Sequence, residues 1–301
     1  MAMTEGTGSE LFRRVTLEAG LHLVATPIGT ARDITLRALD TLASADVLAA
    51  EDTRVLRHLM EIHGIPRRDR AVIPYHDHNG TAQRPKLLGL IKEGQSIAYA
   101  SDAGTPLVAD PGFQLARAVI EAGHVVRSVP GPSALLSALS VAGLPTDRFL
   151  FAGFPPSAAG ARQRWVDEIA NVTTTLVIFE AGRRVDDLLG AFCASGQTAR
   201  SVAICRELTK RFEEIRRGDM VSVRNAISEH PLKGEVVVVL GPRQQEIPTE
   251  ETVRAALEEA LTRQPLKDAA AQVARDMGWR KRTVYQLGLS LKASDRRQEG
   301  T

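Results

Sequence analysis

Cysteine and aromatic residues are scarce in this 301-residue sequence. Its two cysteines, Cys193 and Cys205, supply neither a disulfide framework nor the paired thiolates of a structural zinc site. We therefore expect a protein of a reducing compartment, the cytoplasm. Aromatic residues make up only 4% of the chain. This scarcity disfavours a sheet that stacks nucleobases on exposed rings, and it favours recognition of any nucleic acid by shape and phosphate.

A strong excess of one charge is also missing. The 38 Lys and Arg residues against 36 Asp and Glu residues give a formal net charge of +2. Affinity for a nucleic acid must therefore come from a local basic patch rather than from the whole surface. Short basic clusters of this kind occur at 67–70, 183–184, 206–211, 216–217 and 280–282.

Long hydrophobic runs and the common nucleotide-binding motifs are absent as well. No apolar run reaches the length of a membrane span, and residues 1–20 lack the apolar core of a signal peptide. We expect a soluble protein with a flexible leader over 1–20 and no membrane partner. Neither a G-x-G-x-x-G run in the first strand–helix unit nor a Walker loop occurs. Hydride transfer and phosphoryl transfer thus lose their main support.

The first half of the chain alternates short apolar runs with helical patterns. Each apolar run is followed by a stretch with apolar residues at helical spacing, which is typical of strand–helix units. Such an alternation predicts an α/β domain with a largely parallel sheet over residues 21–146. The expected strands lie at 21–25, 47–50, 71–73, 96–100 and 125–129.

The second half begins again after Pro145, with an apolar run at 149–154 followed by two prolines. Its composition predicts a mixed α/β domain over 147–242. Beyond a charged linker, residues 250–292 show helical spacing without a strand signal, and Gly278 divides them into at least two helices. We expect a helical extension there and a flexible tail over 293–301. The expected strands of the second half are 173–179, 202–205 and 236–240, and its expected helices are 185–194 and 220–228.

The stretch from Ser101 to Gly112 reads S-D-A-G-T-P-L-V-A-D-P-G and lies between an expected strand and an expected helix. Ligands of open α/β sheets bind at such strand ends. Gly104 can bring its backbone close to a ligand, and Asp102 and Thr105 offer hydrogen-bonding groups. From the residues alone, a polar turn whose Asp side chains cap backbone N–H groups is an equal alternative. Similar loops end the other strands, and a cleft between the two halves would gather them.

Two other polar groups have simple structural explanations. His76-Asp77-His78 lacks a third ligand at a characteristic spacing, so a solvated polar loop is favoured over a metal site and we predict no metal. Glu51 and Asp52 could act as paired acid and base. Taken alone, they are more typical of an acidic first turn at the positive end of a helix.

Seven motifs in fixed order together resemble those of the ribosomal RNA small subunit methyltransferase I family, within the tetrapyrrole methylase (class III methyltransferase) superfamily. They are T-P-I-G, A-E-D-T-R, S-D-A-G-T-P-L-V-A-D-P-G, P-G-P-S-A, G-F-P-P, R-E-L-T-K and K-G-E. The similarity covers about residues 21–242, and the helical extension is also similar to that of the family.

The resemblance implies a two-domain class III methyltransferase with a small C-terminal helical extension, acting as a homodimer. It implies the cofactor S-adenosyl-L-methionine and a 16S ribosomal RNA substrate within the small ribosomal subunit. The implied reaction is 2′-O-methylation of a cytidine in the decoding region, by in-line transfer of the methyl group to the ribose 2′-hydroxyl. The demands of such a reaction are mostly those of positioning.

The resemblance also implies which residues bind the cofactor. They are Pro27, Gly104, Thr105, Pro106, Val108, Ala109, Ser133, Ala134, Phe179, Glu180, Gly234 and Glu235. Thr105 stands where other branches of the superfamily have an acid. Two departures from the family pattern, Thr30 and the segment 76–80, leave the contacts to RNA open.

A ribose hydroxyl is a weak nucleophile, so a base or an electrostatic aid is expected. The candidate bases are Asp102, Glu51 and Glu207, with Lys210 and Arg54 to orient a phosphate or an oxyanion. The alternative is that Arg206, Glu207 and Lys210 form an ion-pair network between the domains.

Other functions remain open at this stage. The substrate of the same fold could be a tetrapyrrole precursor or the diphthamide precursor on elongation factor, and the chain could be an RNA-binding module without catalysis. The helical extension, with Trp279, Tyr285 and the basic run 280–282, could clamp RNA or form a packed cap on the dimer.

Overall fold

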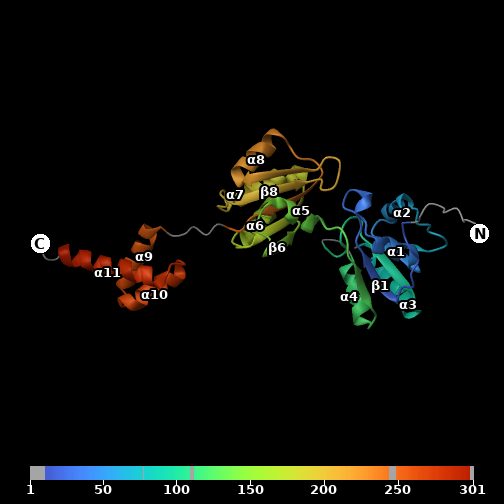
Figure 1. Cartoon of the computed structure of the whole chain (residues 1–301), viewed down its shortest axis with the longest axis horizontal. Helices are drawn as coiled ribbons and strands as arrows, with labels where there is room; N and C mark the ends of the chain where they lie inside the picture. Colours follow the sequence, from blue (N-terminus) through green and yellow to red (C-terminus); the bar gives the residue numbers. More distant parts are fainter. Residues whose placement is uncertain (1–10, 77, 109–111, 244–248, 299–301) are drawn as a thin grey trace, which may run out of the picture. The chain divides into compact units, whose positions relative to one another are not determined.

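The computed structural model describes residues 11–76, 78–108, 112–243 and 249–298, with side chains up to Leu291. The chain forms two compact units, Met1–Arg243 and Gln244–Thr301. The larger unit contains two five-stranded sheets, which Figure 1 shows in separate lobes, one around β1 and one around β6 and β8. The predicted division near residue 146 falls between these sheets but stays a prediction.

The first sheet is parallel throughout, with strand order β3-β2-β4-β1-β5. Two hydrophobic clusters cover its two faces, which explains why the central strands are apolar without alternation. The strands are β1 (Gly20–Val24), β2 (Val47–Ala50), β3 (Val72–Pro74), β4 (Ser96–Ala100) and β5 (Val126–Val129). The helices between them are α1 (Leu36–Ser44), α2 (Thr53–Ile62), α3 (Gly80–Lys92) and α4 (Phe113–Glu121), with a 3₁₀ turn at Ala31–Asp33.

Part of the predicted flexible leader is packed against this first sheet. Phe12 is buried in the cluster that contains α1. The backbone N–H of Arg13 donates to Asp40 and that of Val15 donates to Ser44. Burial of one large aromatic side chain, together with these two hydrogen bonds, fixes a segment whose composition predicts flexibility.

The second sheet is mixed, with strand order β6-β7-β10-β8-β9. Only β6 and β7 pair in parallel, and the other pairs are antiparallel. Its strands are β6 (Phe149–Gly153), β7 (Thr175–Ala181), β8 (Ser201–Arg206), β9 (Glu214–Asp219) and β10 (Glu235–Leu240). The helices α6 (Ala159–Ile169), α7 (Val185–Ala194) and α8 (Met220–Glu229) cover one face, and a 3₁₀ turn spans Gly182–Arg184.

The other face of the second sheet is covered by α5 (Ala134–Ala142). Leu135 and Leu139 of this helix pack among the side chains of Val177, Ala203 and Val237. The predicted boundary assigned this helix to the first domain, whereas its packing ties it to the second sheet. Neither α6 nor β9 was predicted from the sequence.

The smaller unit has its own hydrophobic core, formed by three helices. They are α9 (Glu250–Leu261), α10 (Leu266–Asp276) and α11 (Lys281–Gln298). Gly278 lies in the turn between α10 and α11, as the break in the helical pattern predicts. The helix α11 continues past Lys292 into the segment that was expected to be a flexible tail. In the described part of the chain, no helix combines the length and the apolarity that crossing a membrane requires.

Candidate functional site

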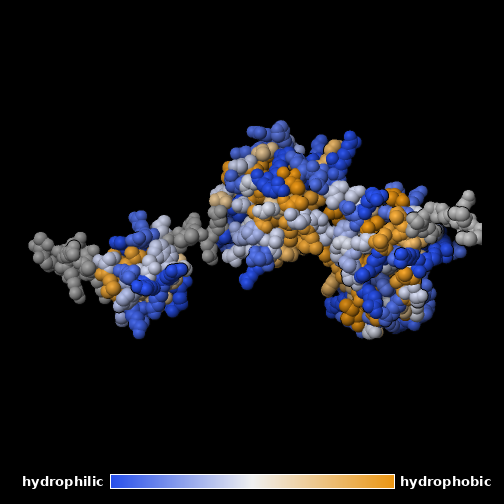
Figure 2. All heavy atoms as spheres, in the orientation of Figure 1, coloured by the Kyte–Doolittle hydropathy of each residue, from blue (hydrophilic) through white to orange (hydrophobic). Residues whose placement is uncertain are grey.

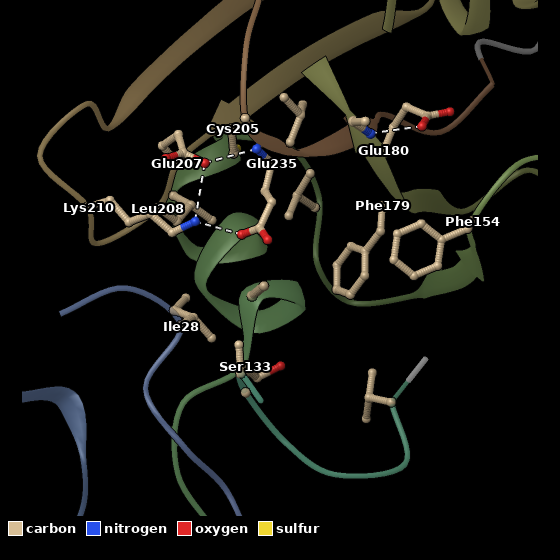
Figure 3. A pocket seen from close by; sticks show the side chains of 18 of the residues that line it. Ile28, Ser133, Phe154, Phe179, Glu180, Cys205, Glu207, Leu208, Lys210 and Glu235 are labelled. Atoms are coloured by element: carbon tan, nitrogen blue, oxygen red, sulfur yellow. Dashed lines mark hydrogen bonds and ion pairs between the residues drawn. The ribbon is translucent and has the colours of Figure 1, made fainter. Parts of the chain in front are cut away.

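The larger unit contains a cavity of about 320 Å³ between loops of the first half and strands of the second sheet. Figure 3 shows side chains from both sides of it. The lining residues from the first half are Ile28, Ala103, Gly104, Thr105, Val108, Ser133 and Ala134. Those from the second are Phe154, Phe179, Glu180, Ala181, Cys205, Glu207, Leu208, Lys210, Gly234, Glu235, Val236 and Val237.

The wall from the first half is held by hydrogen bonds between neighbouring strand ends. Because β1 and β4 are adjacent and parallel, their carboxyl ends meet at one edge. Thr26 and Gly104 exchange two backbone hydrogen bonds, of 2.9 and 3.0 Å. The hydroxyl of Thr105 donates to the carbonyl of Pro132 at 2.9 Å and joins this loop to the one before α5. The loop that carries the S-D-A-G-T-P motif is therefore fixed on both sides.

The wall from the second half depends on the antiparallel pairing of β10. Its first residues lie opposite the last residues of β7 and β8, with Glu235 facing Ala181 and Val236 facing Arg206. The Phe179 ring packs edge-on against Phe151 and Phe154, with centroids 4.8 and 5.6 Å away. Aromatic and aliphatic side chains thus form one side of the cavity, and Figure 3 shows the two labelled rings beside each other.

Three charged residues form what we call the pocket network: Glu207, Lys210 and Glu235. The ammonium of Lys210 lies 3.2 Å from Glu207 Oε1 and 2.6 Å from Glu235 Oε2. Glu207 Oε1 also accepts a hydrogen bond of 2.9 Å from the backbone N–H of Glu235. Figure 3 shows these contacts as dashed lines at one side of the cavity.

Gly234 makes the pocket network possible. Its φ of +83° is a conformation that side chains other than glycine rarely adopt. A Cβ atom at this position would lie 2.5 Å from Glu207 Oε1 and 2.7 Å from its carboxyl carbon. The glycine of the K-G-E motif thus leaves room for the Glu207 carboxylate to reach the N–H of Glu235.

The contacts in the pocket network shift the pKa values of its members. The hydrogen bond from the N–H of Glu235 is the main cause that lowers the pKa of Glu207, and Lys210 lowers it further. For Lys210 the largest single effect is burial, which lowers its pKa, but Glu235 and Glu207 together outweigh it and the net pKa is raised. Both groups are therefore held in their charged forms around neutral pH.

Glu180 lies on the other side of the cavity from the pocket network (Figure 3). Its side chain is only 2% exposed, and burial raises its pKa. Oε1 accepts from the N–H of Ala181 at 2.8 Å. Oε2 lies 3.1 Å from the Arg184 guanidinium but has no partner in hydrogen-bonding geometry among the described residues. Because Glu180 follows Phe179 in β7, its carboxylate lies on the opposite face of the sheet from the Phe179 ring and is directed toward Arg184.

The two halves of the larger unit touch at Gly29. A Cβ atom there would lie 2.5 Å from the Thr209 hydroxyl and 2.6 Å from Lys210 Cγ. The hydroxyl of Thr209 also accepts a hydrogen bond of 3.2 Å from the N–H of Thr30. The glycine of the T-P-I-G motif thus permits close approach of the loop that carries Glu207 and Lys210.

A second polar group lies at the carboxyl ends of β2 and β4. We call Glu51, Asp52, Arg54 and Asp102 the strand-edge cluster. Asp52 pairs with Arg54 at 2.6 Å, and its backbone N–H donates to Asp102 Oδ1 at 2.9 Å. The side-chain hydrogen bond from Arg54 is the main cause that lowers the pKa of Asp52 to about 2. Asp52 also accepts from the N–H of Arg54 and so caps α2, in agreement with an acidic residue at a helix start.

Comparisons with known proteins follow the same division of the chain. The sequence model of the family described as "Tetrapyrrole (Corrin/Porphyrin) Methylases" matches residues 20–224, and one described as "RsmI C-terminal HTH domain" matches 246–292. A curated protein from Mesorhizobium japonicum, named Ribosomal RNA small subunit methyltransferase I, is 44% identical, with 94% of this chain and 96% of that protein covered. A protein of the same name from Haemophilus influenzae is 40% identical, over 90% of this chain and 96% of its own. The chain belongs to this methyltransferase family.

Solved structures agree on the fold of this family. A conserved hypothetical protein from Aeropyrum pernix has a TM-score of 0.59 at 17% identity and covers 92% of this chain and 98% of its own. The uroporphyrin-III C-methyl transferase of Thermus thermophilus complexed with S-adenyl homocysteine has a TM-score of 0.52 at 21% identity, over 74% of this chain and 97% of its own. The predicted fold class, an α/β class III methyltransferase with a helical extension, and the predicted family are both confirmed.

The methyltransferase cavity brings together most of the residues that the motifs suggested. The predicted cofactor residues that line it are Gly104, Thr105, Val108, Ser133, Ala134, Phe179, Glu180, Gly234 and Glu235. Pro27 and Pro106 adjoin lining residues but do not line it, and Ala109 lies outside the described residues. Of the five predicted catalytic residues, Glu207 and Lys210 line the cavity, whereas Asp102, Glu51 and Arg54 belong to the strand-edge cluster.

Several lining residues were not predicted. Ile28, Phe154 and Leu208 lie inside motifs that carried the family resemblance, so their place in those motifs was an available signal. Cys205 and Val237 have no local signal, because they reach the cavity only through the pairing of β8 with β10. Burial raises the pKa of the Cys205 thiol to about 11, so it lines the cavity as a neutral group.

Arg206, Glu207 and Lys210 form ion pairs, but among the described residues these pairs lie within the second half rather than between the domains. Contact with the first half is made by Thr209, which accepts from the N–H of Thr30, and by Lys210, whose Cγ lies close to Gly29. Among the described residues, no three His, Cys, Asp or Glu side chains gather closely enough to hold a metal ion.

Proposed function

We propose that this protein transfers a methyl group from S-adenosyl-L-methionine to the 2′-hydroxyl of a cytidine in the decoding region of 16S ribosomal RNA. The general activity, that of a ribosomal RNA small subunit methyltransferase, is supported by the names of relatives that align over about nine-tenths of the chain. One structural observation connects the proposed reaction with the cavity. Six of the seven family motifs, from both halves, contribute residues to one cavity of a size that suits a small ligand.

The residues around this cavity fit the cofactor. Apolar side chains such as Ile28, Val108 and Phe179 can enclose an adenine ring. The carboxylates of Glu207 and Glu235 and the ammonium of Lys210 offer partners for the ribose hydroxyls and for the amino-acid part of the cofactor. When bound, S-adenosyl-L-methionine supplies an electrophilic methyl group on a sulfonium, and a related methyltransferase was solved in complex with S-adenyl homocysteine.

Asp102 is the best placed of the three candidate bases. It immediately precedes Ala103, which lines the cavity, and it lies at the strand edge where a substrate can approach. The lowered pKa of Glu207 makes that carboxylate a weaker base, and its contacts favour a role in shaping the cofactor pocket. We propose that Asp102 receives the proton of the ribose hydroxyl, while Arg54 and Glu51 shape the surface beside it.

Lys210 is proposed to position the cofactor rather than a phosphate. Its ammonium is already held between Glu207 and Glu235. A cation that is paired twice contributes less to an incoming phosphate than an unpaired one, because part of its field is already compensated. Removal of its charge should therefore weaken binding of S-adenosyl-L-methionine more than binding of RNA.

The homodimer is proposed to form through the outer surface of α5 and β6. Leu136 of α5 is 58% exposed, and Phe149 of β6 is 43% exposed. Phe151, two residues after Phe149, belongs to the cluster with α5, so Phe149 lies on the same face of the sheet. Figure 2 shows hydrophobic side chains over this part of the second half. Light scattering on the purified protein should give twice the chain mass, and Leu136→Arg should reduce it. A single-chain mass for the unaltered protein contradicts the dimer.

The helical extension is proposed to contact RNA. Exposed basic residues precede and begin α11, at Arg280, Lys281 and Arg282, and Tyr285 is exposed one turn later. Since this unit has a core of its own, charge reversal on its surface can be tested without loss of fold. Lys281→Glu with Arg282→Glu should weaken RNA binding and leave cofactor affinity unchanged. A change in dimer mass without a change in RNA affinity would instead support the packed cap.

The test of the function uses labelled S-adenosyl-L-methionine and small ribosomal subunits that lack the modification. After incubation with the protein, the RNA is digested and the labelled nucleoside is identified. Label in 2′-O-methylcytidine from the decoding region is the expected result. Saturable cofactor binding without label in this RNA would contradict the proposed substrate, and a tetrapyrrole precursor or the diphthamide precursor would then be tried. Absence of cofactor binding would support an RNA-binding module without catalysis.

A further inference from the structure

The loop between β8 and β9 carries a highly exposed aromatic side chain. Phe212 is 62% exposed, more than Phe113, Phe149 or Phe154. An exposed aromatic ring forgoes the free energy that its burial would contribute. Such a side chain at the tip of an ordered loop is therefore a candidate for contact with another molecule.

The loop is built rigidly enough to hold this ring in place. The N–H of Thr209 donates to the carboxylate of Glu213 at 2.6 Å, and the N–H of Glu213 donates to the carbonyl of Lys210 at 3.1 Å. Glu207 and Thr209 adopt φ values of +49° and +62°. Side chains other than glycine take this conformation at a cost in energy, and such strain is found where surrounding structure enforces it. The exposure of Phe212 thus follows from a defined loop conformation.

Arg211 distinguishes this loop further. Its guanidinium carbon lies 5.4 Å from the centre of the Phe212 ring. Within the described part of the chain, the neighbouring cations are paired, since Arg206 contacts Glu214 and Lys210 contacts Glu207 and Glu235. Arg211 has no carboxylate within ion-pairing distance among those same residues. Its charge is available to an external anion.

The loop also forms part of the wall of the cofactor pocket. Leu208 and Lys210 line the cavity, and Thr209 contacts the first half at Thr30. Phe212 follows two residues after Lys210 and does not itself line the cavity. The ring and the guanidinium therefore lie outside the pocket, on the same short loop that closes one of its sides.

We propose that Phe212 and Arg211 form a platform on which an unpaired nucleobase of the RNA substrate stacks, next to the ribose that is methylated. The proposal rests on the proposed function and specifies a substrate contact within it. An aromatic face and a guanidinium plane are the groups that proteins use to stack bases of single-stranded RNA, and the free charge of Arg211 complements a flanking phosphate. A single platform of this kind is compatible with the low aromatic content, which argues only against a sheet of stacking rings.

The experiment measures initial rates of methyl transfer to small ribosomal subunits that lack the modification, at varied RNA and at varied S-adenosyl-L-methionine. The variants are Phe212→Ala, Phe212→Trp and Arg211→Gln, with Ile120→Ala as control. Ile120 lies on α4 and is 61% exposed, so the control removes an apolar side chain of equal exposure elsewhere. Melting temperatures and light scattering establish that each variant keeps its fold and its mass.

Phe212→Ala is expected to raise the KM for RNA by about 5- to 100-fold, the range measured when a stacking aromatic is removed, with the KM for S-adenosyl-L-methionine unchanged. Phe212→Trp should restore RNA binding, because a tryptophan also offers a flat ring. Arg211→Gln should reduce the slope of log affinity against log salt concentration by about 0.7. Ile120→Ala should leave all these values unchanged.

Three results would overturn the platform. The first is an unaltered KM for RNA in Phe212→Ala. The second is an equal loss in Phe212→Trp, and the third is a change in dimer mass, which would place Phe212 in contact with a second copy. These results are distinct from failure of the proposed function, in which the unaltered protein itself transfers no methyl group to the subunits.

Discussion

The pocket network and the strand-edge cluster are both polar, both belong to family motifs and both contain residues that were expected to serve catalysis, yet they differ in construction. The pocket network lines the cavity, and its charges satisfy one another. The strand-edge cluster lies beside the cavity, at the ends of two parallel strands. The difference teaches that neighbouring motifs can be built for different roles, and we propose that the pocket network shapes the cofactor site while the strand-edge cluster faces the substrate.

This division predicts opposite kinetic signatures. Changes in the pocket network should act on cofactor affinity, whereas changes in the strand-edge cluster should act on the rate of methyl transfer with cofactor affinity preserved. Two substitutions test it, each with a matched control, and a third tests the contacts of the pocket network through stability.

The largest effect is expected for Asp102→Asn. If Asp102 receives the proton of the ribose hydroxyl, its loss should lower kcat by about 10²- to 10⁴-fold. The dissociation constant for S-adenosyl-L-methionine, measured by calorimetry, should stay unchanged, because Asp102 does not line the cavity.

Asp46→Asn is the matched control for Asp102→Asn. Asp46 accepts two hydrogen bonds from Ser96 at the opposite, amino ends of the same two strands. It should affect stability and leave kcat unchanged. Turnover of Asp102→Asn at the original rate and with the original pH dependence would show that Asp102 is not the base.

An intermediate effect is expected for Gly234→Ala. The added Cβ would displace the Glu207 carboxylate and open the pocket network. Together with the strain of a positive φ, this should weaken cofactor binding by about 10- to 100-fold, as judged from the usual cost of such strain. Binding of labelled S-adenosyl-L-methionine by equilibrium dialysis measures it.

Gly196→Ala separates backbone strain from the contact with Glu207. Gly196 has a φ of +76°, but a Cβ there would meet nothing within 4 Å. This variant should lose stability, by about 1 kcal/mol, and keep its cofactor affinity. Equal losses of cofactor affinity in both glycine variants would mean that Glu207 does not shape the pocket.

The smallest effect concerns the pH dependence of stability. Because the pKa of Glu207 is lowered in the folded protein, its contribution is fully present above the ordinary glutamate pKa and is lost as the pH falls through the lowered value. Glu207→Gln should therefore cost about 1 kcal/mol or less at neutral pH, as for other partly exposed ion pairs, and less still at acidic pH. Urea unfolding at a series of pH values measures this difference. A difference that grows as the pH falls would contradict the assigned contacts.

The first sheet could be predicted from the sequence because its information is local. Each buried strand is a short apolar run, and Asp52 and Thr35 mark helix starts. Parallel strands then place their carboxyl ends together by geometry, so the loops around Ser101 and Glu51 could be expected at one edge. The side-chain contacts that separate the strand-edge cluster from the pocket do not follow from these patterns.

The second sheet was harder to predict because β9 and the covering helix α6 lack an apolar pattern of their own. In β9 the arginines form ion pairs and hydrogen bonds instead, with Arg216 contacting Glu214 and Arg217 donating to the carbonyl of Val141. In α6 a buried Arg162 occupies a core position and pairs with Asp187. Pairing partners for such residues are distant in sequence, so periodicity does not reveal them.

The helix α5 has a consequence for how this fold can be inherited and divided. It follows the first sheet in the chain but covers an apolar face of the second sheet. A gene fragment cut at residue 146 would give one product a helix without its sheet and the other a sheet without its cover. Neither product would be soluble by itself. The first would expose the apolar face of α5 to water, and the second would expose the face of the sheet that α5 covers. The two halves are therefore expected to be exchanged only together, or with the cut placed before α5.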